Sequence, residues 1–257
     1  MADPHQSLPF SLSRATYGLY AWTLFVLLGI AVVPVLLLIP SLQRRRAVVR
    51  AIGRWVLRGV GMHVHVLGVP LPDGPCVVVA NHTSYLDGVV LQAVLPTRFS
   101  FVIKREMADV PLAGTLLRRI GAEFVERQDR LRGARDARRL MRNAARGEAL
   151  VFFPEGTFSA AVGLLRFHIG AFAAATRAGL PLVPIAIRGT RHCLPPEKPW
   201  PRPGRIEVEV LAAISGQRTA EESYDAEHAA HLRTAARTAL LAALGEPDLA
   251  DADAQRA

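Results

Sequence analysis

A histidine and an aspartate five residues apart stand between two apolar runs of the chain. The stretch reads VVVANHTSYLDGVVL over residues 77–91, and the pair is His82 and Asp87. A carboxylate that holds one nitrogen of an imidazole fixes its tautomer, which leaves the other nitrogen free to accept a proton. This pair could therefore act as the general base that removes a proton from a substrate hydroxyl.

The two side chains can meet only if a turn separates them. In one continuous helix, positions five apart are rotated by roughly 140° from each other. Residues 77–80 predict a buried strand, and residues 84–94 predict a helix with Ser84 as its N-cap. His82 would then precede the helix and fold back over Asp87 in the first turn. Such strand ends border the crevice in which open α/β sheets bind ligands.

The same spacing also has a purely structural interpretation. Ser84-x-x-Asp87 is close to a capping box, so Asp87 could serve only to cap the helix and complement its dipole. A lone HxxxxD pattern also arises by chance in a chain with 8 histidines. A catalytic role therefore needs support from other parts of the sequence.

The rest of the chain alternates strand-like and helix-like patterns, which predicts an α/β fold. The expected strands are 63–67, 76–80, 99–103, 122–126, 149–153, 182–187 and 205–211, and the expected helices are 84–94, 111–119, 129–146, 168–178 and 219–244.

The N-terminal part predicts a membrane anchor. Residues 17–39 contain no charge and would form a helix of roughly 35 Å, longer than a hydrocarbon core of about 30 Å. A helix buried on every side in the protein core is the alternative. The stretch is too long for a signal-peptide core and no A-x-A cleavage site follows it, so we expect it to be retained.

A second, basic helix should follow the apolar one. In SLQRRRAVVRAIGRWVLRGVGM, residues 41–62, arginines interleave with apolar residues. This helix could lie on an anionic bilayer face or pack on the domain, because both need the same periodicity. Arginine-rich flanks stay in the cytoplasm, so we expect the protein at the cytoplasmic face of the cell membrane. We divide the chain into membrane-anchoring helices at 1–62, a folded domain at 63–245 and a disordered tail at 246–257.

Composition narrows the possible partners. The 257-residue chain has a formal net charge of +9, which favours an anionic partner such as acidic lipid, nucleic acid or an acidic carrier protein. Aromatic residues make up only 7% and no nucleic-acid-binding motif occurs, so we expect no nucleic-acid partner. The two cysteines, Cys76 and Cys193, lie far apart without metal-ligand spacing, and we expect no bound metal.

Four ordered blocks of the sequence resemble one known family. The blocks are NHTSYLD, K-x-E-x-x-x-x-P-x-x-G with a later FVER, FPEGT, and VPIAIRG, and they fall within residues 76–189. In order and spacing the set resembles the glycerolipid acyltransferase family, whose best-known members are lysophosphatidate acyltransferases. The resemblance implies a mixed, largely parallel sheet flanked by helices.

The resemblance also implies a reaction. His82 would take the proton from the hydroxyl of a lysophospholipid, most of all 1-acyl-glycerol-3-phosphate, and Asp87 would hold the imidazole. The hydroxyl would attack the thioester of acyl-CoA or acyl-carrier-protein, with no cofactor beyond this acyl donor. No GxSxG elbow occurs, so direct transfer is favoured over an acyl-enzyme. Main-chain N–H groups around Gly156 could stabilise the oxyanion. The apolar surface between helix 111–119 and the sheet could hold the acyl chain.

Positions that match the family's substrate-binding residues are Lys104, Arg127, Glu155, Gly156 and Thr157. One position departs from the family pattern, because Glu-Gly-Thr-Arg-Ser reads Glu-Gly-Thr-Phe-Ser here and Phe158 replaces an arginine credited with holding the acceptor phosphate. A phenyl ring cannot make the bidentate bonds of a guanidinium to phosphate. Arg166 could reach in from the following loop, or the acceptor could be a different lysolipid.

Two other interpretations stay open. A membrane-tethered basic binding protein would contain His82 and Asp87 as a structural pair only. The arginine-rich helix 129–146 could dock an acidic carrier protein or could simply present a solvated face.

Overall fold

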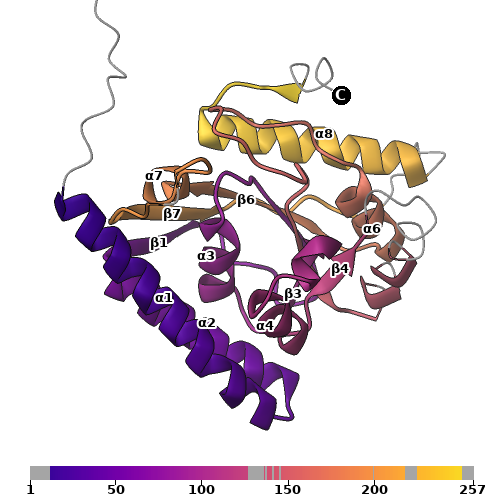
Figure 1. Ribbon diagram of the computed structural model, residues 1–257. Helices are drawn as coiled ribbons and strands as arrows, with labels where there is room; N and C mark the ends of the chain where they lie inside the picture. The colour runs from indigo at the N-terminus through magenta and orange to yellow at the C-terminus, as the bar shows by residue number, and fades with distance from the viewer. Residues whose placement is uncertain are drawn as a thin grey trace, which may run out of the picture.

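The computed structural model describes residues 12–126, 136, 138–140, 142–144, 146–198, 200–217 and 225–250 of the chain. At its centre is a seven-stranded sheet with helices on both faces (Figure 1). The strands lie in the order β1-β7-β6-β2-β5-β3-β4. Their bounds are β1 (Met62–Gly68), β2 (Val77–Ala80), β3 (Phe99–Lys104), β4 (Glu123–Val125), β5 (Ala149–Phe152), β6 (Leu182–Arg188) and β7 (Gly204–Val210).

The sheet is mixed and largely parallel, which confirms the prediction. Strands β1 and β7 pair parallel with each other, β7 pairs antiparallel with β6, and every pair from β6 to β4 is parallel. All expected strands are present, and each bound lies within one residue of the prediction. The central strands β2 and β5 are buried along their whole length because helices cover both faces of the sheet.

Two layers of helices enclose the sheet. Val78 and Ala80 of β2 pack in a core cluster with α3, whereas Val77 and Val79 pack in a second cluster with α6 and α8. The alternation follows from the period of two residues in a strand. The helices are α1 (Leu12–Leu38), α2 (Leu42–Gly59), α3 (Leu86–Val94), η1 (Arg105–Ala108), α4 (Ala113–Arg119), α6 (Gly170–Ala178), α7 (Thr190–Cys193) and α8 (Asp225–Leu244). Within the expected helix 129–146, the described residues 136, 138–140 and 142–144 are helical, and the others lie outside the described part of the chain.

Several arginines of α2 bond to carbonyls of the folded domain. Arg46 is only 6% exposed and donates to the carbonyl of Ile120 at 2.8 Å, and Arg54 donates to the carbonyl of Ala93 at 2.8 Å. These carbonyls lie at the C-terminal ends of α4 and α3, where helices leave carbonyl groups without intrahelical partners. The prediction that α2 packs on the domain, one of the two that its periodicity allowed, is therefore confirmed.

Helix α1 lies beside α2 along one side of the molecule (Figure 1). Its residues Ser13–Leu38 are long and apolar enough to cross a membrane, and only 17% of the most apolar window is buried in protein. Polar bonds fasten both ends of the helix, since the Tyr17 hydroxyl donates to the carbonyl of Val60 at 2.5 Å and Arg119 donates to that of Leu37 at 2.7 Å. The alternative of a helix buried on every side is therefore excluded.

The prediction of a disordered tail is wrong for residues 246–250. The N–H of Leu249 donates to the carbonyl of Leu164 at 3.0 Å, and the N–H of Leu164 donates to that of Pro247 at 2.9 Å. The composition of residues 246–250 does not predict these hydrogen bonds, because their partner, Leu164, is far away in the sequence. Residues 251–257 lie outside the described part.

Candidate active site

The loop between β2 and α3 carries His82 and is fastened to neighbouring elements on both sides. The side chain of Asn81 exchanges two hydrogen bonds with the main chain of Ile187, at 2.9 and 2.7 Å. The Ser84 hydroxyl donates to the carbonyl of Leu194 at 2.7 Å. Asn81 and Ser84 are both buried, so they hold the loop in place. Neither of these long-range contacts is predictable from the local sequence, since each depends on a partner more than a hundred residues away.

His82 and Asp87 meet, as the predicted turn requires. Nδ1 of His82 lies 2.9 Å from Oδ2 of Asp87. An ionised carboxylate can only accept, so Nδ1 carries the hydrogen and Nε2 keeps a free lone pair. The same oxygen accepts from the N–H groups of Thr83 at 2.6 Å and Ser84 at 2.8 Å. Asp87 therefore holds the turn that precedes α3 and orients the histidine at the same time.

Aromatic rings surround the His82 imidazole. The Phe153 ring stacks on it with centroids 4.2 Å apart at an interplanar angle of 22°. The Phe158 ring meets it edge-on at 4.6 Å and also meets the Tyr85 ring at 4.7 Å. The face of an aromatic ring attracts a nearby cation. The stacked Phe153 thus suits an imidazole that becomes protonated in the course of a reaction.

Glu155 holds the backbone of the site. The side chain is 3% exposed, with Oε1 accepting from the N–H of His82 at 2.6 Å and Oε2 accepting from the N–H of Leu165 at 2.8 Å. Burial raises the pKa of Glu155 to about 8, although both of these N–H groups act in the opposite direction. The expectation that Glu155 binds substrate is corrected by this geometry, because both oxygens are used within the protein.

A cavity of about 700 Å³ opens beside the histidine. Its lining is mostly apolar and comes from α1, α2, α3, α4 and β3, which matches the apolar surface expected next to helix 111–119. Basic groups on the lining are His82 and Lys104 alone among the described residues. Phe158 and Tyr85 line the cavity next to the histidine. The His82 imidazole therefore faces a chamber suited to a long apolar chain.

Comparison with known proteins agrees with this geometry. Residues 63–188 match the family model described as Acyltransferase. The chain belongs to the acyltransferase family. A 1-acyl-sn-glycerol-3-phosphate acyltransferase of Neisseria meningitidis is 35% identical over 148 residues, which are 57% of this chain and 56% of that protein. This chain spans about half the length of the curated relatives it matches.

Two further proteins extend this comparison. A lyso-ornithine lipid O-acyltransferase of Pseudomonas aeruginosa is 37% identical over 128 residues, which are 48% of this chain and 47% of that protein. The crystal structure of the 1-acyl-sn-glycerophosphate acyltransferase PlsC from Thermotoga maritima aligns with a TM-score of 0.71 at 23% identity, over 91% of this chain and 94% of that one. The structural comparison shows that this chain has the same fold as PlsC.

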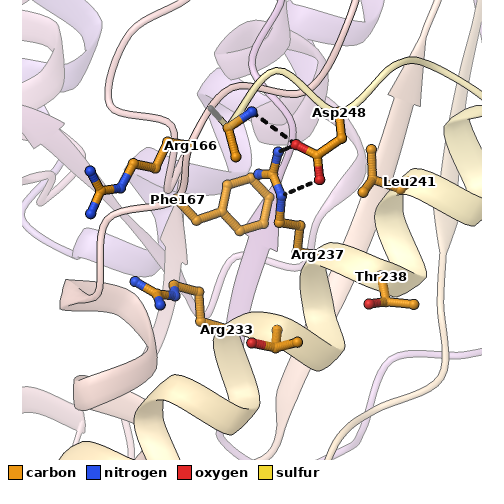
Figure 2. Close-up of a pocket in the computed structure, with 9 residues that line it drawn as sticks. Arg166, Phe167, Arg233, Arg237, Thr238, Leu241 and Asp248 are labelled. Carbon is orange, nitrogen blue, oxygen red and sulfur yellow. Dashed lines mark hydrogen bonds and ion pairs between the residues drawn. The ribbon is translucent and has the colours of Figure 1, made fainter. Parts of the chain in front are cut away.

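The expected substrate-binding residues do not all lie around the same cavity. Lys104, Gly156 and Thr157 line the cavity, and the Lys104 ammonium lies 2.9 Å from a carboxylate oxygen of Glu106. Arg166 does not reach in to replace the missing arginine, because it lines a separate hollow (Figure 2). The remaining expected residue, Arg127, lies outside the described part of the chain.

Among the main-chain N–H groups around Gly156, that of Gly156 itself is engaged within the protein. The N–H of Gly156 already donates to the carbonyl of Phe153 at 3.1 Å, which closes the turn that carries Glu155. Gly156 has φ of 75°, a left-handed conformation that glycine adopts without steric cost. This glycine therefore shapes the turn, and its N–H is not free to stabilise an oxyanion.

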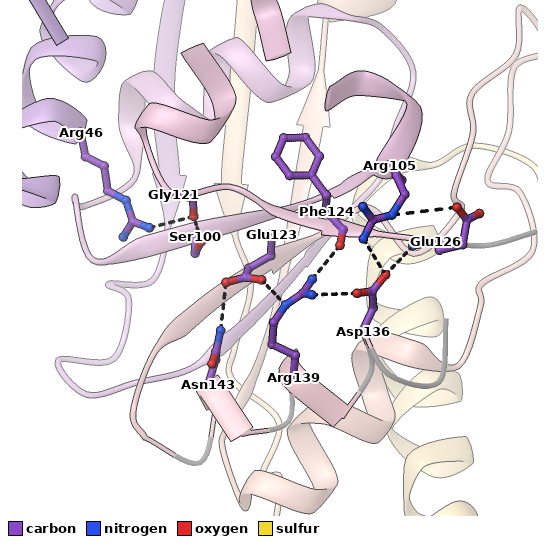
Figure 3. Close-up of polar contacts among 10 residues, drawn as sticks. All are labelled: Arg46, Ser100, Arg105, Gly121, Glu123, Phe124, Glu126, Asp136, Arg139 and Asn143. Carbon is purple, nitrogen blue, oxygen red and sulfur yellow. Dashed lines mark hydrogen bonds and ion pairs between the residues drawn. The ribbon is translucent and has the colours of Figure 1, made fainter. Parts of the chain in front are cut away.

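Ion pairs fix the edge strand β4 next to the cavity wall (Figure 3). Arg139 lies 3.0 Å from a Glu123 oxygen and 2.8 Å from an Asp136 oxygen. Asp136 also accepts from the N–H of Glu126 at 2.9 Å. Arg139 belongs to the arginine-rich segment 129–146, so at least this guanidinium serves the fold and is not available to an acidic carrier.

Proposed function

We propose that this chain transfers a fatty acyl group from acyl-CoA or acyl-carrier-protein to the hydroxyl of a lysophospholipid. The observation that carries the proposal is a histidine whose Nδ1 is held by Asp87 and whose ring lines a large apolar cavity. The first candidate acceptor is 1-acyl-glycerol-3-phosphate, the substrate named for relatives in Neisseria meningitidis and other organisms.

The proposed reaction uses a single base. Nε2 of His82 removes the proton of the acceptor hydroxyl as its oxygen attacks the thioester carbonyl, and Asp87 stabilises the resulting imidazolium. The tetrahedral intermediate then expels the donor sulfur, which takes the proton back from Nε2. The product is an ester and a free thiol, and the histidine returns to its starting state. Glu155 acts as a positioning residue, because it holds the main chain of His82 and of Leu165.

The acyl chain would occupy the apolar cavity between α1, α3 and α4. We further propose that α1 rests in the cytoplasmic leaflet of the cell membrane, since its exposed apolar side chains include Leu27, Ile30 and Leu38 at 59%, 53% and 84% exposure. A lysolipid could then pass from the leaflet to the cavity without crossing water.

A different acceptor is the second candidate, and Phe158 favours it. In 1-acyl-glycerol-3-phosphate the phosphate is carried by the carbon next to the one with the attacked hydroxyl, so it would lie close to His82, where Phe158 and Tyr85 offer apolar ring surfaces. Desolvating a phosphate there without a guanidinium partner is costly. A lysolipid without a phosphate beside its hydroxyl avoids this cost. The lyso-ornithine lipid acylated by the Pseudomonas aeruginosa relative is one such acceptor.

An acceptor panel tests both candidates. Purified protein would receive one labelled acyl-CoA, or the matching acyl-carrier-protein, with 1-acyl-glycerol-3-phosphate and lyso-ornithine lipid in competition. Transfer to either acceptor supports the proposed function, and transfer to neither rejects it. Phe158→Arg should raise the preference for the phosphate acceptor by at least tenfold, with Phe158→Leu as the matched control that adds no charge. Equal preferences in the arginine and leucine variants would remove Phe158 as the determinant.

A further inference from the structure

A second hollow, of about 420 Å³, lies apart from the cavity at His82 (Figure 2). It is formed by the segment that carries Arg166 and Phe167, by one side of α8, and by the end of the described chain near Asp248. None of these residues lines the large cavity. We call it the arginine hollow, because Arg166, Arg233 and Arg237 line it.

Only one of the three guanidinium groups is engaged. Arg237 pairs with Asp248 and donates to the carbonyls of Leu164 and Leu165 at 2.8 and 2.6 Å. Among the residues that the structure describes, neither Arg166 nor Arg233 has an ion-pair or hydrogen-bond partner. Figure 2 shows their guanidinium groups on the same side of the Phe167 ring. The hollow therefore holds two uncompensated positive charges.

The floor of the hollow is rigid. Phe167 is 2% exposed, and the Arg237 guanidinium lies 5.0 Å from the centre of its ring. Since Arg237 is also bonded to two main-chain carbonyls, its positive charge is fixed to the backbone at the floor of the hollow. Arg166 and Arg233 keep their hydrogen-bond donors available for an anion above this floor.

The arginine hollow is connected to the catalytic histidine through one short path. Leu165, next to Arg166 in the chain, donates its N–H to Glu155, and Glu155 accepts the N–H of His82 with its other oxygen. A ligand with its reactive end at His82 and an anionic end in the hollow would lie over this segment. Acyl-CoA has this shape, with a thioester at one end of a pantetheine arm and phosphate groups at the other.

We propose that the arginine hollow binds the phosphate groups of acyl-CoA, an assignment that rests on the proposed acyl transfer. Guanidinium groups pair with phosphate through charge-assisted, bidentate hydrogen bonds. The concave site fits a compact anion better than the broad acidic surface of a carrier protein, because three arginines line one hollow of about 420 Å³ and Arg237 already neutralises the Asp248 carboxylate there.

The test compares two acyl donors in the full-length protein. Acyl-CoA carries phosphate groups, whereas acyl-pantetheine carries the same thioester and none. In Arg166→Ala/Arg233→Ala, the KM for acyl-CoA should rise by roughly 10-fold or more, and kinetics with acyl-pantetheine should not change. The control is Arg177→Ala/Arg205→Ala, which removes the same charge from exposed positions outside the hollow. The control should keep the wild-type KM for acyl-CoA.

Several outcomes would overturn the assignment. They are an unchanged KM for acyl-CoA, an equal loss with both donors, an equal loss in the control, or a loss confined to acyl-carrier-protein. Equilibrium binding of CoA itself, measured with no acceptor present, separates this proposal from the proposed function. Wild-type protein that binds CoA but transfers no acyl group would reject the function, and weaker CoA binding by the double variant would still support the arginine hollow.

Discussion

The main-chain N–H of His82 donates a hydrogen bond of 2.6 Å to the side chain of Glu155, which joins two sequence blocks more than seventy residues apart. The other oxygen of Glu155 holds Leu165. A substitution at Glu155 would therefore displace His82 and the segment that carries Leu165 together, although the Glu155 side chain does not line the cavity.

The Glu155 carboxyl should make stability depend on pH. Burial raises its pKa in the folded protein from the ordinary value of 4.5 to about 8, so across this range the folded protein keeps a proton that the unfolded chain releases. The free energy of unfolding should accordingly fall as pH rises from about 5 to about 8. Thermal unfolding of the detergent-solubilised protein would measure this slope. Glu155→Gln, which does not titrate, should have a flatter profile, and parallel profiles would contradict the assignment.

Replacing His82 should remove most of the activity without unfolding the protein. Loss of a general base costs roughly 10² to 10⁴-fold, so His82→Ala should lower kcat by that factor. His65→Ala removes an exposed histidine on β1 and serves as the control. Turnover of the His82 variant within a few-fold of wild type would reject the mechanism.

Asp87→Asn should select the wrong tautomer of the histidine. An amide can donate its own N–H to Nδ1, which places the ring hydrogen on Nε2 and prevents that atom from accepting a proton. We expect kcat to fall by roughly 10² to 10⁴-fold with a small change in KM. Asp109→Asn, an exposed aspartate outside the site, should behave like wild type. A kcat within tenfold of wild type would show that another group orients the imidazole.

The buried arginine of α2 should matter for stability. Arg46 donates to the main-chain carbonyls of Ile120 and Thr97, and its removal would leave these acceptors without the guanidinium donor, whereas the Gly121 carbonyl would keep Ser100. We expect Arg46→Met to lower the free energy of unfolding by about 2–4 kcal/mol, and Arg44→Met, at an exposed position, to change it by less than about 0.5 kcal/mol. Chemical denaturation in detergent would compare the two. Equal effects would mean that the carbonyl contacts contribute nothing.

Charges on the outer side of α1 should weaken membrane association. Leu27→Arg/Ile30→Arg places two guanidinium groups on exposed apolar positions, and we expect sedimentation with lipid vesicles to fall by at least tenfold. Ala235→Arg/Ala242→Arg adds the same charge to the exposed side of α8. If both pairs bind vesicles equally well, α1 is not the membrane contact.

The strands and the contact between His82 and Asp87 were predictable because their signals are local. The apolar run at 77–80 marks β2, and the turn between His82 and Asp87 follows from residues within the same ten positions. The short helices η1 and α7 were missed, since four residues do not establish a helical period.

What the sequence did not reveal depends on long-range pairing. Arg166 was expected near the substrate, but it lines a hollow together with α8, which is far away in the chain. The arginines of α2 find carbonyls at the ends of two other helices, and the periodicity of α2 cannot distinguish these from lipid phosphates. Residues 246–250 are ordered by Leu164, which no local composition indicates.

Helix α1 supplies Trp22 and Phe25 to the wall of the large cavity. Shortening the gene to obtain a water-soluble fragment would therefore do more than detach the protein from lipid. It would remove one side of the chamber in which the fatty chain is expected to sit, so a fragment that begins after α1 should bind long chains poorly even where the histidine and its partner remain intact.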